Sequence, residues 1–416
     1  MNALHFFLRS FVRHYLSPLL IFVSASVAGQ RMSREQVVQT ALQNNQLIKS
    51  AEYQIEYYKQ LKKTATDVGK LSAMWMHGQY NSIYQDNNFT LTQSIPFPTS
   101  LGAQVRLGKE QVIGSQKNLV ATQNSLIFDV KSAYEELLHQ EALKKLLATQ
   151  DSLYTDFAKA STLRFKTGES NLLEKVTAET QLLEVRNIAR QNEADIQISQ
   201  TRMQALLKSD APIIASEDLT RLSPPEEGSS FHGNPQLEYL KQQVAISSQF
   251  KRVERNRMLP DIMLGYFSQS LIGVQNIDGS DRFFGAGKQF QGFELGLAIP
   301  LWLPPHVAKT RAAAFQEEAT KQNAEYFKTS LTGAFTQATQ ELAKSQASLT
   351  YYENNALQNA ELILTQARKS YRGGEIGYIE YLQSLRNALT IKSNYLLSLN
   401  QYNHSIIKLE FLLGKF

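Results

Sequence analysis

The sequence predicts a mainly α-helical chain with a small β part: long antiparallel coiled-coil helices and four β-strands. Three observations lead to this prediction. The stretch 99–165 contains no proline and would span roughly 100 Å as one helix. From Leu382 to Leu413, leucine or isoleucine recurs at a spacing of about 3.5 residues, which is typical of coiled coils. The chain also contains an internal two-fold sequence repeat.

The repeat is visible in two pairs of segments. Residues 94–97 resemble residues 298–301, at an offset of 204, and residues 165–169 resemble residues 371–375, at an offset of 206. We therefore divide the mature chain into a first repeat (29–210), a proline- and glycine-rich linker with short helical pieces (211–233), and a second repeat (234–416). Each repeat is expected to contain a helix, two strands, a long helix, a glycine turn and a final helix.

Residue types and breaks place the elements within each repeat. Ser33 and Gln36 have the spacing of a capping box, which begins the first helix. In the first repeat we expect helix 33–66, strands 73–84 and 89–97, and helices 99–165 and 169–208. In the second we expect helix 235–258, strands 261–270 and 290–299 separated by loop 271–289, helix 305–370, and a helix ending near 413. The two short helices of a repeat together match the long one in length, so they should stack end to end beside it.

The strands alternate between apolar and small or polar residues. In 290–299, Phe293, Leu295 and Leu297 share one face, and glycine and Glu294 lie on the other. A membrane barrel with lipid outside and water inside gives this pattern, and so does a sheet packed on helices. Four strands cannot close a barrel, so in the first case several chains must share one transmembrane β-barrel. Trp75 and Trp302 are then expected at one end of the sheet, in an interfacial aromatic girdle.

The first 28 residues have the pattern of a secretory signal peptide. Arg9 and Arg13 precede the apolar run 16–27, and residues 26–28 form a small-x-small cleavage site. The chain has no cysteine, which excludes disulfides, thiolate metal sites and an acylated anchor. The net charge of +5 favours no nucleic-acid partner.

Residues that could carry chemistry are scattered. The histidines lack metal-ligand spacing, and no nucleophile elbow or phosphate-binding loop is present, so we expect no enzyme, no metal site and no cofactor. Glu135 and His139 should form an exposed pair on a helix surface. The basic residues around Glu254 should lie on a solvated helix face; they are Lys251, Arg252, Arg255 and Arg257.

Together these landmarks resemble the TolC family of outer-membrane efflux proteins. The segments that carry the resemblance are 164–168, 259–261, 299–301, 370–375 and 409–414. The resemblance implies a homotrimer with a twelve-stranded β-barrel in outer-membrane lipid and a periplasmic α-barrel. It also implies a passive exit duct whose partners are a periplasmic adaptor (membrane fusion) protein and an inner-membrane transporter of the resistance-nodulation-division type.

The resemblance assigns roles at the periplasmic tip, where it places the turns at Gly168, Gly373 and Gly374. Aligned on Gly374, the pore aperture falls on Glu380 and Gln383. Contacts between neighbouring coiled coils at the entrance fall on Glu174 and Tyr371. An arginine usual in the family is replaced by Ile376, and Lys175 and Arg372 are the candidates to substitute for it.

Two questions stay open at this stage. The segment 302–306 lacks the usual glycine turn and the chain lacks cysteine, which resembles the Cus/Czc-like heavy-metal branch; drug efflux and type I protein export are alternatives. The alternative function is a periplasmic coiled-coil structural or adaptor protein without a pore.

Overall fold

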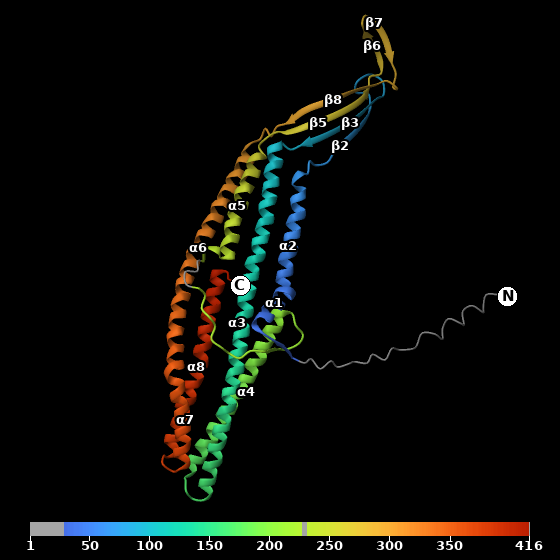
Figure 1. The fold of residues 1–416 in the computed structure, drawn as a ribbon. Coiled ribbons are helices and arrows are strands. Elements are labelled where there is room, and N and C mark those ends of the chain that lie inside the picture. Colours follow the sequence, from blue (N-terminus) through green and yellow to red (C-terminus); the bar gives the residue numbers. More distant parts are fainter. Residues whose placement is uncertain (1–28, 227–230, 416) are drawn as a thin grey trace, which may run out of the picture.

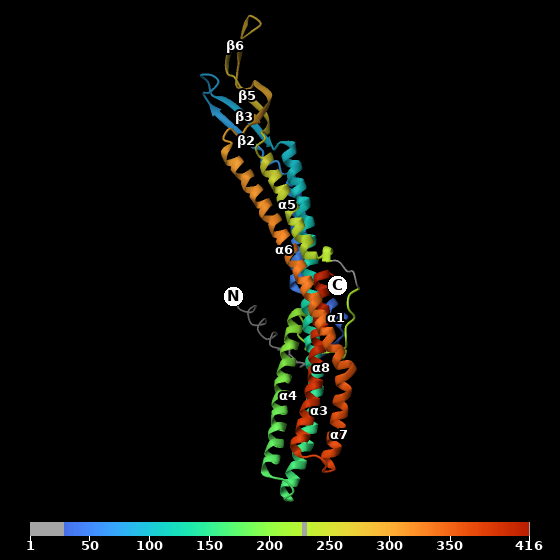
Figure 2. The ribbon, with the colours of Figure 1, turned by 90° about the vertical axis from the view of Figure 1, so that its left-hand side faces the viewer.

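A computed structural model describes residues 29–226 and 231–415, so the predicted signal peptide lies outside the described residues. The described chain is elongated. Long helices run side by side, a four-stranded sheet lies at one end, and the turns between α3 and α4 and between α7 and α8 lie at the other (Figure 1). The sheet lies beyond the ends of α3, α5 and α6 in both views (Figure 1 and Figure 2), and its strands are tilted away from the helix axis in Figure 1.

Helices make up most of the chain. They are α1 (Arg34–Asn44), α2 (Gln46–Lys63), α3 (Pro98–Lys166), α4 (Leu172–Leu207), α5 (Pro235–Asn256), α6 (Pro304–Tyr351), α7 (Leu357–Arg372) and α8 (Tyr378–Leu413), with a π-helical turn η3 (Tyr352–Ala356) and short 3₁₀ turns η1 (Thr64–Thr66) and η2 (Phe231–Gly233). None of the described helices is long and apolar enough to cross a membrane.

The strands belong to three sheets. They are β1 (Gln30–Met32), β2 (Ser72–Gly78), β3 (Asp86–Ile95), β4 (Ile213–Ala215), β5 (Asp261–Ser270), β6 (Gly273–Ile277), β7 (Ser280–Phe284) and β8 (Gln289–Ala298). The main sheet is antiparallel, in the order β2-β3-β5-β8. It confirms the four predicted strands, although β2 ends at Gly78 rather than at residue 84.

Two further strand pairs were not predicted. The expected loop 271–289 contains the hairpin β6–β7, whose turn has a positive φ at Asp278 and Gly279. The linker contains one expected short helical piece, η2, and also β4, which pairs in parallel with β1. Isolated three-residue strands carry too little pattern to be seen in a sequence, because their pairing depends on segments far apart in the chain.

The short helices stack beside the long ones as expected. α2 and α4 contact successive parts of α3, and α8 lies beside α6 and α7 below α5 (Figure 1). The predicted helix 33–66 is divided at Asn45, whose extended backbone ends α1. The Asn45 side chain then caps α2 by accepting from the Leu47 amide (2.8 Å), and it donates to the Leu206 carbonyl (2.9 Å).

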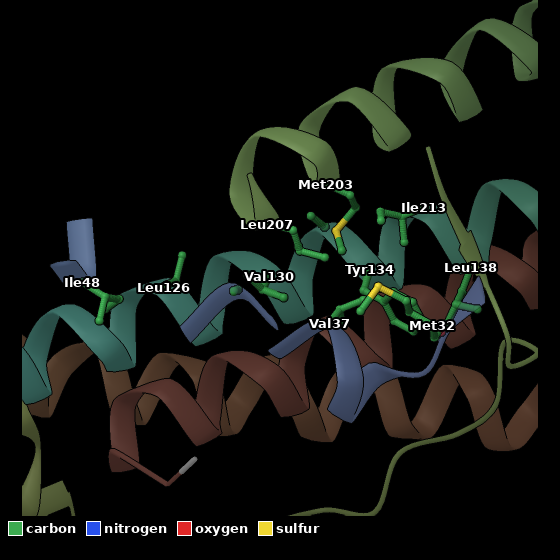
Figure 3. Packing of buried hydrophobic residues seen from close by; sticks show 12 residues of the cluster. Met32, Val37, Ile48, Leu126, Val130, Tyr134, Leu138, Met203, Leu207 and Ile213 are labelled. Carbon is green, nitrogen blue, oxygen red and sulfur yellow. The ribbon is translucent and has the colours of Figure 1, made fainter. Parts of the chain in front are cut away.

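The largest apolar cluster lies halfway along the body, where the start of the described chain meets α3, α4 and the linker (Figure 3). Tyr134 is fully buried there, and its hydroxyl donates to the Met32 carbonyl at 2.8 Å. Ile213 of β4 and Val37 of α1 are fully buried in the same cluster. The linker is therefore part of the core rather than a loose connection.

Candidate functional site

The two glycine turns at the helical end have the same backbone. Gly168 and Gly374 have φ values of +77° and +74°, a region that disfavours residues with a Cβ. The Glu169 amide donates to the carbonyl five residues earlier at 2.8 Å, and the Glu375 amide does so at 2.9 Å. Both turns are Schellman caps. Gly373, which precedes Gly374 in the second turn, has a negative φ, so this position does not require glycine.

Just inside these turns, the structure brings Glu174 and Tyr371 together. The Tyr371 hydroxyl donates to Oε1 of Glu174 at 2.7 Å, and both residues are buried. The Ser161 hydroxyl donates to the same oxygen at 3.4 Å. Burial raises the pKa of Tyr371, and the hydrogen bond to Glu174 raises it further. The contact joins the α3–α4 hairpin to the α7–α8 hairpin.

The arginine of this cluster is Arg164, which sequence reasoning missed. Its Nη1 atom lies 3.4 Å from Glu174, and its guanidinium lies 5.5 Å from the centre of the Tyr371 ring. Of the two candidates from the sequence, Lys175 pairs within its own helix with Glu179 at 3.8 Å. Arg372 reaches the other hairpin only through an exposed 4.0 Å pair with an aspartate.

A signal for Arg164 existed in the sequence. It stands four residues before Gly168, which is one helical turn, so a helix ending at that glycine places it close to the turn. The family pattern directs attention to the other hairpin instead.

Aromatic packing joins the same hairpins. The Tyr371 and Tyr381 rings stack with centroids 4.4 Å apart and planes 6° apart. Phe157 of α3 contacts both rings edge-on, at 5.7 and 5.4 Å. This packing fixes the direction in which the Tyr371 hydroxyl points.

Glu380 and Gln383 lie exposed on the first turns of α8. The Glu380 carboxylate accepts from the Gly377 amide at 3.3 Å, so it caps the helix. Gln383 donates to Asn387 at 3.0 Å. In the described part of the chain, neither Glu380 nor Gln383 forms a hydrogen bond or ion pair with the Glu174 cluster. An aperture lined by these residues would require further copies of the chain.

At the opposite end, the sheet has one apolar face that no other part of the described chain covers. Phe293 is 87% exposed and Leu295 is 79% exposed, and their neighbours across β5 are Tyr266 and Leu264. On the other face, β8 carries the small or polar residues Gly292, Glu294 and Gly296, with Phe290 as the exception. There Gly292 leaves room for the Phe267 ring, which would lie 2.6 Å from an added Cβ. The strands β2 and β8 form the two edges of the sheet.

The expectation that both tryptophans lie at one end of the sheet is wrong. Trp75 pairs with Phe89, which is level with Gln291. Ala298 ends β8 seven residues farther toward the helices, roughly 24 Å at about 3.4 Å per residue, and Trp302 follows beyond it. The reason is that β2 begins some distance from the end of the sheet that adjoins the helices. Both indole rings are exposed, at 68% and 75%.

Glu135 and His139 were expected to form an exposed pair on a helix surface, but both residues are buried. Glu135 is fully buried; its Oε2 accepts from Arg34 at 2.9 Å and its other oxygen accepts from Asn403. Asn403 also donates to the Thr220 carbonyl at 2.8 Å. A buried charge needs such partners, and this network ties the beginning of the described chain, α3, α8 and the linker together.

The basic run on α5 is only partly solvated. Lys251 forms an ion pair with the buried Glu317 of α6, and Arg257 pairs with the buried Glu254 at 2.8 Å. The Lys251–Glu317 pair therefore joins α5 to α6, and the Arg257–Glu254 pair is local to the end of α5. The described residues contain no group of three or more histidines or carboxylates placed to hold a metal ion.

A family model described as "outer membrane efflux protein" matches residues 230–415. This part of the chain is thus similar to outer membrane efflux proteins. No curated protein matches the chain.

Solved structures extend the fold of the efflux protein domain to nearly the whole chain. CusC has 16% identity and a TM-score of 0.75, covering 93% of this chain and 94% of its own. OprN has 16% identity and a TM-score of 0.77, covering 92% and 90%. VceC from Vibrio cholerae has 15% identity and a TM-score of 0.74, covering 92% and 96%. The predicted resemblance to the TolC family, with its long helices and few strands, is thus confirmed.

Proposed function

We propose that this protein is the outer-membrane exit duct of a tripartite efflux system, through which cargo passes passively from the periplasm to the exterior. The observation that carries the proposal is the uncovered apolar face of the β2-β3-β5-β8 sheet, together with its two open edges. Lipid would cover the face, but open edges are not tolerated in lipid. Copies of the chain must therefore join their sheets edge to edge.

A homotrimer satisfies this requirement with twelve strands. Twelve strands fall within the range of outer-membrane barrels, and eight is about the smallest closed form. The residues opposite the apolar face then line the interior of the barrel; on β8 these include Gly292, Glu294 and Gly296. The helices of three chains would continue this wall as an α-barrel through the periplasm.

The entrance of the duct lies at the glycine turns. We propose that the Tyr371–Glu174–Arg164 cluster holds the two hairpins of each chain together when the entrance is closed. In a trimer, three Glu380 side chains would surround the axis, with Gln383 one turn farther along α8. Like charges gathered in this way repel one another and attract cations.

The partners follow from the location of the entrance. A duct that does not use energy needs a periplasmic adaptor and an energised inner-membrane transporter, which we propose to be of the resistance-nodulation-division type. For cargo, we propose heavy-metal cations, because CusC is among the structures with this fold and residues 302–306 enter α6 without a glycine turn. Metal ions would be cargo here and would need no binding site in the wall.

Reconstitution in planar bilayers tests the duct. Purified protein should form trimers and insert as long-lived ohmic channels. Leu295→Arg, on the apolar face, should reduce insertion strongly, because arginine at the bilayer midplane costs about 2–4 kcal/mol. Thr92→Arg, on the opposite face, is the matched control and should still insert. Protein that remains monomeric and does not insert would instead support a periplasmic scaffold or adaptor without a pore.

A further inference from the structure

The helix leading to the second tip contains a π-helical turn that its counterpart lacks. α3 runs as an uninterrupted helix over Pro98–Lys166. The equivalent span Pro304–Arg372 is offset by 206 residues at both ends and is therefore equal in length, yet it is divided by η3 (Tyr352–Ala356). In this turn the Leu357 amide donates to the Tyr352 carbonyl, five residues back. One residue more than in an α-helical turn is accommodated here.

The extra residue determines which way α7 faces. If η3 rewound as α-helix without losing a residue, α7 would turn by about 100° and move about 1.5 Å toward the tip. Tyr371 is buried together with Ala360 and Ala367 on one face of α7. The same rotation would put Ser370 or Arg372 in the place of Tyr371, and the Tyr371–Glu174 bond could not form.

The linker holds the π-helical turn from outside. Arg221 of the linker forms a 3.0 Å ion pair with Glu353 of η3. Its guanidinium also lies 4.8 Å from the centre of the Tyr402 ring on α8. On either side of Arg221, the linker is fixed to α8, because Asn403 donates to the Thr220 carbonyl (2.8 Å) and accepts from the Leu222 amide (3.0 Å). Glu353 is thus held by a segment that is itself anchored.

We propose that η3 is a two-state element, and that the Arg221–Glu353 contact stabilises its π-helical form and thereby the closed tip. From Ala356 to Tyr371 the distance along α7 is about 22 Å at 1.5 Å per residue. A partner that draws the linker away from Glu353 would release the tip over that distance. This inference deepens the proposed function and rests on it, because it concerns how the duct entrance is regulated.

Distances between spin labels test the inference. The protein has no cysteine, so labels can be placed at Lys159→Cys on α3 and Lys369→Cys on α7, which are both exposed. Full-length labelled chain is assembled with an excess of unlabelled chain in detergent, so that only distances within one protomer are read. With the unmodified linker, the labels should give one narrow main distance peak and only a small displaced population. Arg221→Ala should increase a second, displaced population roughly three- to tenfold.

Removal of Asn355 provides the decisive second variant. Asn355 is exposed in η3, and its deletion removes the extra residue while leaving the phase of α7 unchanged. Combined with Arg221→Ala, the deletion should restore the single narrow main peak. Lys117→Ala, which breaks a half-buried ion pair with Glu238 on another helix, is the control and should leave the distribution unchanged.

Two results would overturn the inference. One is a distribution that does not respond to Arg221→Ala. The other is a displaced population that persists after Asn355 is removed, since the disturbance would then not act through the π-helical turn. The label distances are read whether or not the protein conducts ions. Failure of the duct would therefore show in the bilayer recordings and failure of this inference in the distances.

Discussion

The hydroxyl of Tyr371 donates a 2.7 Å hydrogen bond to Glu174, a residue 197 positions earlier in the chain. This bond links equivalent ends of the two repeats, since Tyr371 closes α7 just before one glycine turn and Glu174 opens α4 just after the other. Both groups are buried, so losing Glu174 leaves the Tyr371 hydroxyl without this acceptor, and losing Tyr371 removes one of the donors to the buried carboxylate.

Arg164 should matter more to the closed entrance than Arg372. Arg164→Ala leaves the buried Glu174 with only Tyr371 and Ser161 as hydrogen-bond donors from other elements, which should cost about 1–3 kcal/mol and raise basal conductance about tenfold. Arg372→Ala removes an exposed 4.0 Å pair and should change conductance by less than about fivefold. Single-channel recordings of both variants measure this difference, and equal effects would refute the assignment.

Glu380 should set the ion preference of the entrance. Glu380→Gln keeps the size of the side chain and removes the proposed ring of charge, so preference for cations over anions should fall several-fold, more at low salt than at high salt. Reversal potentials under a salt gradient measure this preference. Glu184→Gln changes an exposed acid on α4 and serves as the control. If Glu380→Gln leaves the reversal potential unchanged, Glu380 does not line the pore.

Glu135 should be critical for stability. Glu135→Ala leaves Arg34 and Asn403 without their shared acceptor and should cost about 3–5 kcal/mol, which is typical of breaking a buried ion pair. Glu193→Ala removes an exposed 3.0 Å pair with Lys144 and should cost less than about 1 kcal/mol. Thermal unfolding of both variants in the same detergent compares them. Similar unfolding temperatures would show that the network does not stabilise the fold.

Stability should fall as the pH drops from about 7.5 to 5.5. Burial lowers the pKa of both His139 and His404 below the ordinary value, although the nearby Glu136 partly opposes the shift. Both groups are therefore more readily protonated in the unfolded chain, whose histidines titrate near about 6.5. Their stabilising contribution is complete above that pH and is lost as the pH falls through the lowered folded values.

Replacing both histidines by glutamine should flatten this dependence. Unfolding temperatures of the double variant and the parent are compared across the same pH range. A slope that is equally steep in both proteins would assign the effect to other groups.

The sequence by itself determined the long helices, the four main strands and the two glycine turns. These features are local: proline-free apolar repeats, alternating strand residues and a glycine at positive φ each report on their own few residues. The pattern on β8 was read correctly for the same reason, since Phe293, Leu295 and Leu297 are exposed as one face.

Only the tertiary structure decided the contacts that join distant segments. Glu135 was expected at the surface, because its helical neighbours cannot show that Arg34 and Asn403 reach it from elsewhere. The register of β2 moved Trp75 away from Trp302, and no local pattern fixes where a strand begins along its partner. The cluster of Arg164 with Tyr371 depends on how two hairpins lie against each other. That arrangement reflects the packing of whole helices, to which each residue contributes only a small part of the free energy.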